Sequence, residues 1–175
     1  WDKICALLPG GGYAQYAVDN EDLCLPIPKN LDFVQAASLP ETIFTVYNNL
    51  ILLGHLKRNE RVLIHGGSSG IGVMGIQVAR YIGASNIIIT AGSDKKCIEC
   101  HSLGATHTIN YKTKDFVAEV IEETSGQGVN LVLDMVGGDY VAKNIKCLSE
   151  NGRHISIAFL NGIKAEINIK EIMSK

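Results

Sequence analysis

The residues best suited to chemistry in this chain form a glycine-rich turn, His65-Gly-Gly-Ser-Ser-Gly-Ile-Gly72, at the end of an apolar run that begins at Arg61. A dinucleotide needs such a turn between a strand and a helix. The backbone must approach the pyrophosphate closely, and the N-terminus of the helix must point at it. The turn therefore predicts a nucleotide-binding site.

The register of this turn decides which residues face the phosphates. A literal search finds the fingerprint spacing at Gly70, Gly72 and Gly75, but that register places the turn inside the following helix. Counting from the end of the strand starts the turn at Gly67 and puts Ser69 at its second glycine position. Ser69 then reduces the backbone clearance and offers a hydroxyl group to phosphate.

The end of the next apolar run, residues 86–90, predicts which dinucleotide binds. Enzymes that use NAD usually place Asp or Glu about 20 residues after the glycines, on the ribose hydroxyls. Here no acid occupies the strand tip, whereas Ser93, Lys96 and Tyr111 could hold a 2′-phosphate. This favours NADPH over NADH. Two alternatives stay open: Ser93 is an ordinary helix N-cap, or Asp94 is a displaced ribose ligand that would favour NADH.

Other reactive side chains carry weaker signals. Cys97-x-x-Cys100 followed by His101 has a metal-like and haem-like spacing, but a structural zinc needs four ligands and no second pair is present. We expect the two cysteines to pack in a helix. His65 is expected to open the turn with its backbone, and Asp134 to order the loop after its strand rather than to act as a base.

The periodicity of the chain predicts the scaffold that positions these residues. From Arg61 onward, short apolar strands alternate with helices of about three turns, which is typical of βαβ units in a parallel sheet. Such a sheet binds ligands at the carboxyl ends of its strands. The expected strands are 61–65, 86–90, 106–110, 130–134 and 153–157. The expected helices are about 70–82, 94–103, 114–124 and 139–148.

The first sixty residues have a different character. All four prolines lie in the first forty positions. The glycines at 10–12 and the alternation over residues 13–18 predict a turn and a strand, and residues 25–28 predict an extended crossover. Residues 41–53 predict a buried helix that is closed by Gly54.

Composition excludes several classes of protein. Apolar residues make up 46% and charged residues 19%, which indicates a folded domain. The net charge of −2 argues against nucleic acid or an anionic membrane as the main partner. No run approaches the roughly 18 apolar residues of a membrane span, and no secretion signal is visible. Five scattered cysteines suit a reducing, cytoplasmic location, and a start at Trp1 suggests a piece of a longer protein.

Six segments of the chain carry a resemblance to a known family: LPGGGYAQYAV, SLPETIFTVYNNL, LIHGGSSGIG, TAGSDKKCIECHSLGA, INYKTKDF and LDMVGGDY. Over its whole length, the chain resembles the zinc-independent quinone oxidoreductase branch of the medium-chain dehydrogenase/reductase superfamily. Members have a GroES-like substrate lobe and a Rossmann lobe for NADPH. The resemblance implies a doubly wound parallel α/β sheet, with residues 1–29 a β remnant of the first lobe and residues 30–175 a Rossmann domain lacking its last strand.

Carried over position by position, the resemblance implies three groups of cofactor-binding residues and no metal ligand. The pyrophosphate would be cradled by Ser69, Gly70, Ile71 and Gly72. The 2′-phosphate and the adenosine ribose would be held by Gly92, Ser93, Lys96 and Tyr111. The nicotinamide side would be lined by Thr45, Val136, Phe159 and Leu160. No catalytic residue is assigned, because the residues facing the acceptor should lie in the lobe that is mostly absent.

The resemblance implies that the parent protein passes a hydride from NADPH directly to a quinone. The fragment alone is expected to be inactive. Two alternatives stay open for the parent or the chain: an enal or enoyl reductase with the same cofactor lobe, and a protein that binds NADPH without catalysis. Family members usually form homodimers through edge strands, and we expect this fragment to pair weakly or differently.

Two related families fit less well. Short-chain dehydrogenases share the GGSSGIG turn but need a Tyr with Lys four residues later for proton transfer. None of the six tyrosines has lysine at that spacing. Zinc alcohol dehydrogenases share the superfamily fold and carry a cluster of four closely spaced cysteines in the first lobe. This sequence includes only a small part of that lobe.

Overall fold

The computed structural model describes residues 2–175, which form two compact units, one up to Thr45 and one from Val46 to Lys175. The division predicted after residue 29 rests on a different criterion, because it separates a remnant of a substrate lobe from a nucleotide-binding domain. That residues 1–29 derive from a substrate lobe stays a prediction.

The first unit contains a small antiparallel sheet of β1 (Ile4–Cys5) and β2 (Leu25–Pro26), with η1 (Glu21–Leu23) between the two strands and α1 (Phe33–Ala37) after them. The strand predicted over residues 13–18 is wrong, because these residues form no strand and Tyr13 and Tyr16 are fully exposed. Alternation alone does not form a strand, since the backbone also needs a partner for its hydrogen bonds. In this unit β1 and β2 pair with each other.

The predicted helix over residues 41–53 is present but is less regular and less buried than expected. It consists of α2 (Leu39–Val46) and η2 (Tyr47–Leu53), a stretch of π-helix that ends at Gly54. Val46 and Leu50 are fully buried, whereas Leu52 and Leu53 are more than half exposed. The apolar run therefore buries only one stripe in the core of the second unit.

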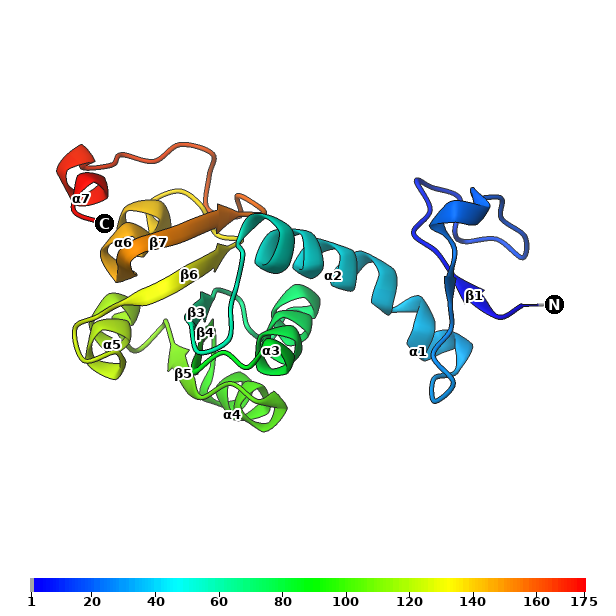
Figure 1. Ribbon diagram of the computed structural model, residues 1–175, viewed down its shortest axis with the longest axis horizontal. Coiled ribbons are helices and arrows are strands. Elements are labelled where there is room, and N and C mark those ends of the chain that lie inside the picture. The colour runs from blue at the N-terminus through cyan, green and yellow to red at the C-terminus, as the bar shows by residue number, and fades with distance from the viewer. Residues whose placement is uncertain (1) are drawn as a thin grey trace. The chain divides into compact units, whose positions relative to one another are not determined.

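The second unit is a five-stranded parallel sheet with the strand order β5-β4-β3-β6-β7 (Figure 1). Every predicted strand and helix of this unit is confirmed, with boundaries that shift by a few residues, and a further short helix, α7, follows. The strands are β3 (Arg61–Ile64), β4 (Asn86–Ala91), β5 (His107–Asn110), β6 (Val129–Asp134) and β7 (Leu148–Ser156). The helices are α3 (Gly70–Ile82), α4 (Asp94–Leu103), α5 (Phe116–Glu123), α6 (Tyr140–Cys147) and α7 (Ile169–Met173).

Helices cover both faces of this sheet, with α3 and α4 on one face and α5 and α6 on the other (Figure 1). Because successive side chains of a strand point to opposite faces, the apolar strands supply two separate cores. Val62 and Ile64 pack toward α3 in one core, while Leu63 packs with Phe116 in the other. This explains why the strands are continuous apolar runs rather than alternating ones.

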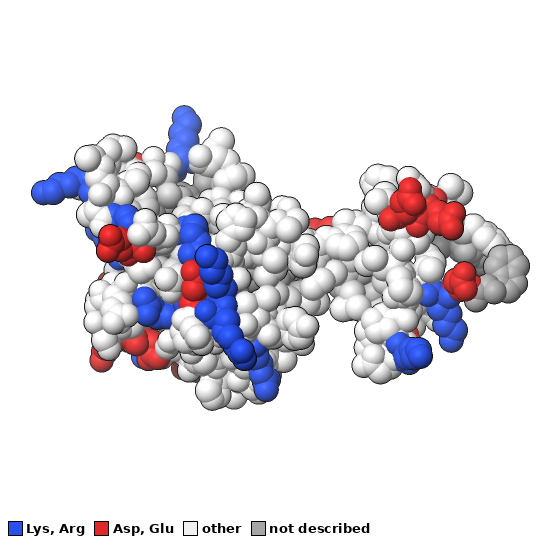
Figure 2. All heavy atoms as spheres, viewed as in Figure 1, with Lys and Arg blue, Asp and Glu red and all other residues white. Residues whose placement is uncertain are grey.

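The surface is mixed in charge. On the face drawn in Figure 2, Lys and Arg side chains of the second unit form a band with acidic side chains beside it. Among the described residues, no helix is long and apolar enough to cross a membrane.

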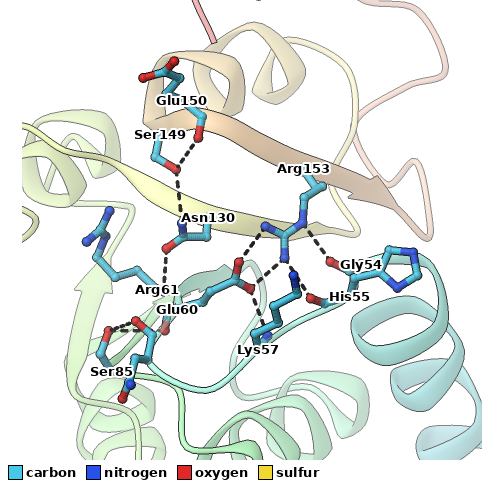
Figure 3. A network of polar contacts seen from close by, with 11 residues as sticks. Gly54, His55, Lys57, Glu60, Arg61, Ser85, Asn130, Ser149, Glu150 and Arg153 are labelled. Carbon is cyan, nitrogen blue, oxygen red and sulfur yellow. Dashed lines mark hydrogen bonds and ion pairs between the residues drawn. The ribbon is translucent and has the colours of Figure 1, made fainter.

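One polar network ties β7 to the end of the π-helix (Figure 3). The guanidinium of Arg153 donates to both carboxylate oxygens of Glu60, at 2.9 and 2.7 Å, and to the carbonyl oxygens of Gly54 and His55. Burial raises the pKa of Glu60, but the hydrogen bonds from Arg153 and from the Lys57 N–H outweigh it and hold that pKa below its ordinary value. The network fixes the segment that leads into β3.

We expect Arg153→Met to lower the free energy of unfolding by about 2 kcal/mol at pH 7, the scale of hydrogen bonds to charged groups. Since the pKa of Glu60 is depressed, the difference from wild type should persist above about pH 4.3 and shrink as the pH falls below it. Urea unfolding at several pH values measures this.

The matched control is Lys143→Met, which removes an exposed ion pair to Asp139 and should cost less than about 0.5 kcal/mol. Equal losses in the two variants would mean that the Arg153 network contributes no more than a surface pair.

Candidate functional site

The glycine turn joins β3 to α3 at the carboxyl end of the sheet. Gly66 has a φ of +63°, and the N–H of Gly67 donates to the carbonyl oxygen of Thr90 on the neighbouring strand at 2.9 Å. Helix α3 begins at Gly70, and its N-cap Ser69 accepts a hydrogen bond from the N–H of Gly72 at 3.0 Å. The turn thus starts at the end of the strand, as the chosen register predicts.

The turn packs so closely that Gly66, Gly67 and Gly72 leave no space for a side chain. A Cβ on Gly72 would collide with the carbonyl oxygen of Gly66 and lie 2.6 Å from the Cα of Gly67. A Cβ on Gly75 would lie 3.2 Å from the end of the Ile64 side chain and would make only ordinary contacts, at 3.8 Å or more, with Ile64 Cγ2 and Leu133. Gly72 is therefore part of the turn, whereas Gly75 lies inside the helix.

This arrangement provides a site for an anion at the start of α3. The first N–H groups of a helix have no partner within the helix, and the helix dipole adds positive potential there. Ser69 satisfies the N–H of Gly72, which leaves those of Gly70 and Ile71 directed out of the helix end. The Ser69 hydroxyl lies 3.7 Å from the sulfur of Met135, so it also contacts the next loop of the site.

A cavity of about 360 Å³ lies beside this turn. Its walls come from the carboxyl ends of β3, β4 and β6 and from the segments after β5 and β7, where strand order reverses in a doubly wound sheet. Of the predicted cofactor residues, Tyr111, Val136 and Leu160 line it. The full lining is Gly66, Thr90, Tyr111, Met135, Val136, Tyr140, Leu160 and Asn161.

Two loops predicted to face the nicotinamide are held together by backbone hydrogen bonds. The N–H of Leu160 donates to the carbonyl oxygen of Met135 at 3.2 Å, and the N–H of Asn161 donates to that of Val136 at 2.7 Å. Phe159, which is more than half exposed, belongs to the same pair of loops. The structure therefore brings Val136, Phe159 and Leu160 together. Thr45 belongs to the first unit, and its predicted role stays a prediction.

At the end of β4 the phenol of Tyr111 lies over Gly92. A Cβ on Gly92 would be 2.9 Å from the Tyr111 hydroxyl and 3.6 Å from the Cε of Lys112. Glycine at this position therefore lets the aromatic ring approach the strand end. The side chain of Lys112, which the sequence analysis did not single out, passes along the same surface.

Ser93 is the N-cap of α4 and accepts a hydrogen bond from the N–H of Lys96 at 3.4 Å. Ser93 therefore has the conformation of an ordinary helix N-cap, which is one of the two alternatives that the sequence left open. The carboxylate of Asp94 accepts a hydrogen bond from the side chain of Asn110 at 2.7 Å. This bond occupies one oxygen of the acid that would favour NADH. The side chain of Lys96 is exposed in the first turn of the helix.

The sequence analysis missed a buried polar network next to the cavity. His65 lies 3.0 Å from the Thr90 hydroxyl through Nδ1 and 2.7 Å from the Asn144 amide oxygen through Nε2. Asn144 and Asp134 both lie near Nε2 of His154, at 3.3 and 3.2 Å. His65 is fully buried, and this burial lowers its pKa against the opposing hydrogen bond of Asn144. A histidine expected to contribute only its backbone is thus a central side chain.

Asp134 orders the loop after β6, as predicted. Its carboxylate accepts hydrogen bonds from the N–H groups of Val136 and Gly137, at 2.7 and 3.2 Å. Burial raises the pKa of Asp134, but the hydrogen bonds from His154 and Val136 outweigh it and hold the pKa below its ordinary value. The carboxylate is therefore charged at neutral pH and held by the loop that it orders.

Cys97 and Cys100 pack into the core between α4 and the sheet, as their spacing predicts. Burial raises the pKa of both thiols. Within residues 2–175, no group of three or more His, Cys, Asp or Glu side chains could hold a metal ion.

Comparisons with known proteins identify the family of this chain. The family model of zinc-binding dehydrogenases matches residues 70–175. The chain is 32% identical to 2-haloacrylate reductase of Burkholderia over 173 residues, which cover 97% of the chain and 52% of the reductase. The crystal structure of Escherichia coli quinone oxidoreductase complexed with NADPH superposes with a TM-score of 0.78 at 30% identity, over 87% of this chain and 46% of that one.

A third similar structure is JamJ enoyl reductase in its apo form, with a TM-score of 0.74 at 32% identity over 87% of this chain and 44% of that one. The chain spans about half the length of the 2-haloacrylate reductase that it matches. Its fold and site define a dinucleotide-binding domain of the doubly wound Rossmann type. The chain belongs to the zinc-binding dehydrogenase family, in the quinone oxidoreductase branch of the medium-chain dehydrogenase/reductase superfamily.

Proposed function

We propose that this chain is the NADPH-binding domain of an oxidoreductase that reduces a quinone. The observation that carries the proposal is the tight turn at Gly66–Gly72, which directs the N-terminus of α3 to the carboxyl edge of the sheet beside a cavity. A pyrophosphate fits such an edge because backbone N–H groups and the helix dipole both favour an anion. The absence of space for a Cβ at Gly72 fits the same use.

The other predicted ligands divide between the two ends of the site. Gly92, Ser93, Lys96 and Tyr111 would hold the 2′-phosphate and the adenosine ribose, and the loops at Val136 and Leu160 would face the nicotinamide. When bound, NADPH supplies the hydride that reduces the acceptor. The chain's contribution is to hold the cofactor in one orientation and to exclude water from one side of its ring.

Reduction of a conjugated carbon–carbon double bond is the second candidate. It is favoured because the chain is 32% identical both to a 2-haloacrylate reductase and to an enoyl reductase, which is as similar as it is to a quinone oxidoreductase, at 30%. The two activities would share this cofactor domain and differ in the acceptor pocket. Turnover of the longer parent protein with a quinone and with an enal separates them, and a parent that binds NADPH but reduces neither acceptor would be a binding protein.

Five free cysteines, three of them buried, fit a cytoplasmic location for the parent.

Calorimetric titration of the chain with NADPH and NADH tests the cofactor. We expect NADPH to bind more tightly, and Lys96→Ala to weaken NADPH about tenfold while leaving NADH unchanged, because only NADPH carries the 2′-phosphate. Lys95→Ala is the matched control, since this exposed neighbour lies on the same helical turn.

Equal or tighter binding of NADH would assign the ribose to Asp94 and contradict the proposal for the cofactor. Equal effects of the two lysine variants would instead indicate general attraction between the phosphates and a basic surface.

A further inference from the structure

A continuous chain of polar contacts connects the glycine turn to the loop after β6. At one end, the N–H of Gly66 donates to the Thr90 hydroxyl at 3.3 Å, and that hydroxyl lies 3.0 Å from Nδ1 of His65. The other ring nitrogen of His65 contacts the Asn144 oxygen at 2.7 Å. Both Gly66 and Thr90 line the cavity.

The second half of the chain of contacts runs from Asn144 to the opposite wall. The Asn144 amide nitrogen lies 3.3 Å from Nε2 of His154, which lies 3.2 Å from the Asp134 carboxylate. That carboxylate accepts the N–H of Val136 at 2.7 Å, and Val136 lines the cavity. Asn144 itself does not line the cavity.

The buried position of these side chains restricts the arrangements that they can adopt. Asn144, His65 and Asp134 are fully buried, where a polar group costs free energy unless it is hydrogen-bonded. Nε2 of His154 can donate to the Asp134 carboxylate or accept from the Asn144 amide but cannot do both at once, so the two contacts compete for that nitrogen and a change at Asn144 alters the contact with Asp134. His65 is also packed edge-on against Phe116 and Tyr140, with ring centroids 4.9 and 5.1 Å away.

Asn144 holds the central place because its side chain presents two different polar atoms to two histidines. Its oxygen accepts from Nε2–H of His65, which leaves Nδ1 of that ring to accept from the Thr90 hydroxyl. Its nitrogen faces His154. A hydrophobic residue of the same size would fill the space but would separate the two halves of the network.

We infer that Asn144 is a positioning residue that sets the nicotinamide-facing loop in register with the pyrophosphate-binding turn. The inference rests on the proposed function and concerns the two halves of that same site. It predicts that loss of the Asn144 amide weakens the half of the ligand that reaches the loop at Val136. The adenosine half, which is held at the ends of β4 and β5, should bind as before.

The test compares NADPH with adenosine 2′,5′-bisphosphate, which lacks the nicotinamide half, in calorimetric titrations of the chain. We expect Asn144→Leu to weaken NADPH about tenfold and to change the affinity for the bisphosphate less than about twofold, since one or two hydrogen bonds are lost at one end of the site. Where Asn144→Leu does not fold, His154→Phe interrupts the same network at a less buried residue and should show the same selective loss.

Arg153→Met is the control for a purely structural effect, because it destabilises the unit from a network that does not reach the cavity. It should leave both affinities within about twofold of wild type. Equal weakening of both ligands in Asn144→Leu and His154→Phe, or no weakening of either, would overturn the inference while the proposed function stands. A wild-type chain that does not bind NADPH would overturn both.

Discussion

Gly72→Ala is expected to weaken NADPH binding about 100-fold and to lower the free energy of unfolding by about 3 kcal/mol. The added Cβ would collide with the carbonyl oxygen of Gly66 and lie 2.6 Å from the Cα of Gly67. Both are backbone atoms, so the clash cannot be relieved by rotation of a side chain. The turn must open, and the N–H groups at the start of α3 then move away from the pyrophosphate. Calorimetric titration and urea unfolding measure the two effects.

Gly75→Ala is the matched control, one helical turn away in α3. The one tight contact of its Cβ would be with the end of the flexible Ile64 side chain, at 3.2 Å, and alanine favours a helix over glycine by about 1 kcal/mol. Its stability should stay within about 1 kcal/mol of wild type, and its NADPH affinity within about twofold. If Gly75→Ala lost binding as Gly72→Ala does, the literal fingerprint register, which contains both glycines, would be the functional one.

Much of the fold of the second unit could be predicted because its elements depend on local sequence. The turn, the buried strands and the helices behind them are specified by residues close together in sequence, such as the apolar run 61–64 followed by glycines. The order of a parallel sheet then brings the strand ends to one edge. Tyr111, Val136 and Leu160 could therefore be placed in one site before their contacts were known.

The errors lie where stability depends on distant partners. Residues 13–18 alternate like a strand, but within the described residues no other strand pairs with them. The run at 41–53 is largely apolar, yet only the stripe that includes Val46 and Leu50 is fully buried, and part of the run forms a π-helix. Local pattern indicates that a segment is apolar, but it does not indicate which face other elements will cover.

The polar network was missed because its members are far apart in sequence. His65 and Asn144 are separated by 79 positions, and His154 meets Asp134 across 20. One signal could have indicated it. Asn144 lies on the same helix face as Tyr140, Val141 and Ile145, where an apolar residue is the expected choice. A polar residue on a buried face needs a buried partner, and the polar residues at the strand ends were the available ones.

Asp134→Asn is the substitution in this network with the largest expected effect on stability. At pH 7 we expect it to lower the free energy of unfolding by about 3 kcal/mol, because hydrogen bonds to a charged acceptor contribute more than neutral ones and the new amide can turn a donor toward the N–H groups of the loop. The carboxylate accepts from Val136 and Gly137 and faces His154, all in a fully buried position. Asp139→Asn, at the other end of the same loop, is the control. Its carboxylate is exposed, so its loss should cost less than about 1 kcal/mol.

The pH dependence of this cost follows from the charge of Asp134. Its pKa in the folded chain lies below the ordinary value, so the folded state binds fewer protons than the unfolded state as the pH falls through the acid range. The stabilisation is thus complete above the unfolded pKa of about 3.9 and is lost as the pH falls through the lower folded value. Urea unfolding of wild type and Asp134→Asn between pH 7 and pH 2 should show a constant difference above about pH 4 that shrinks as the pH falls below it. A constant difference over the whole range would mean that the loop is held by the shape of the side chain and not by its charge.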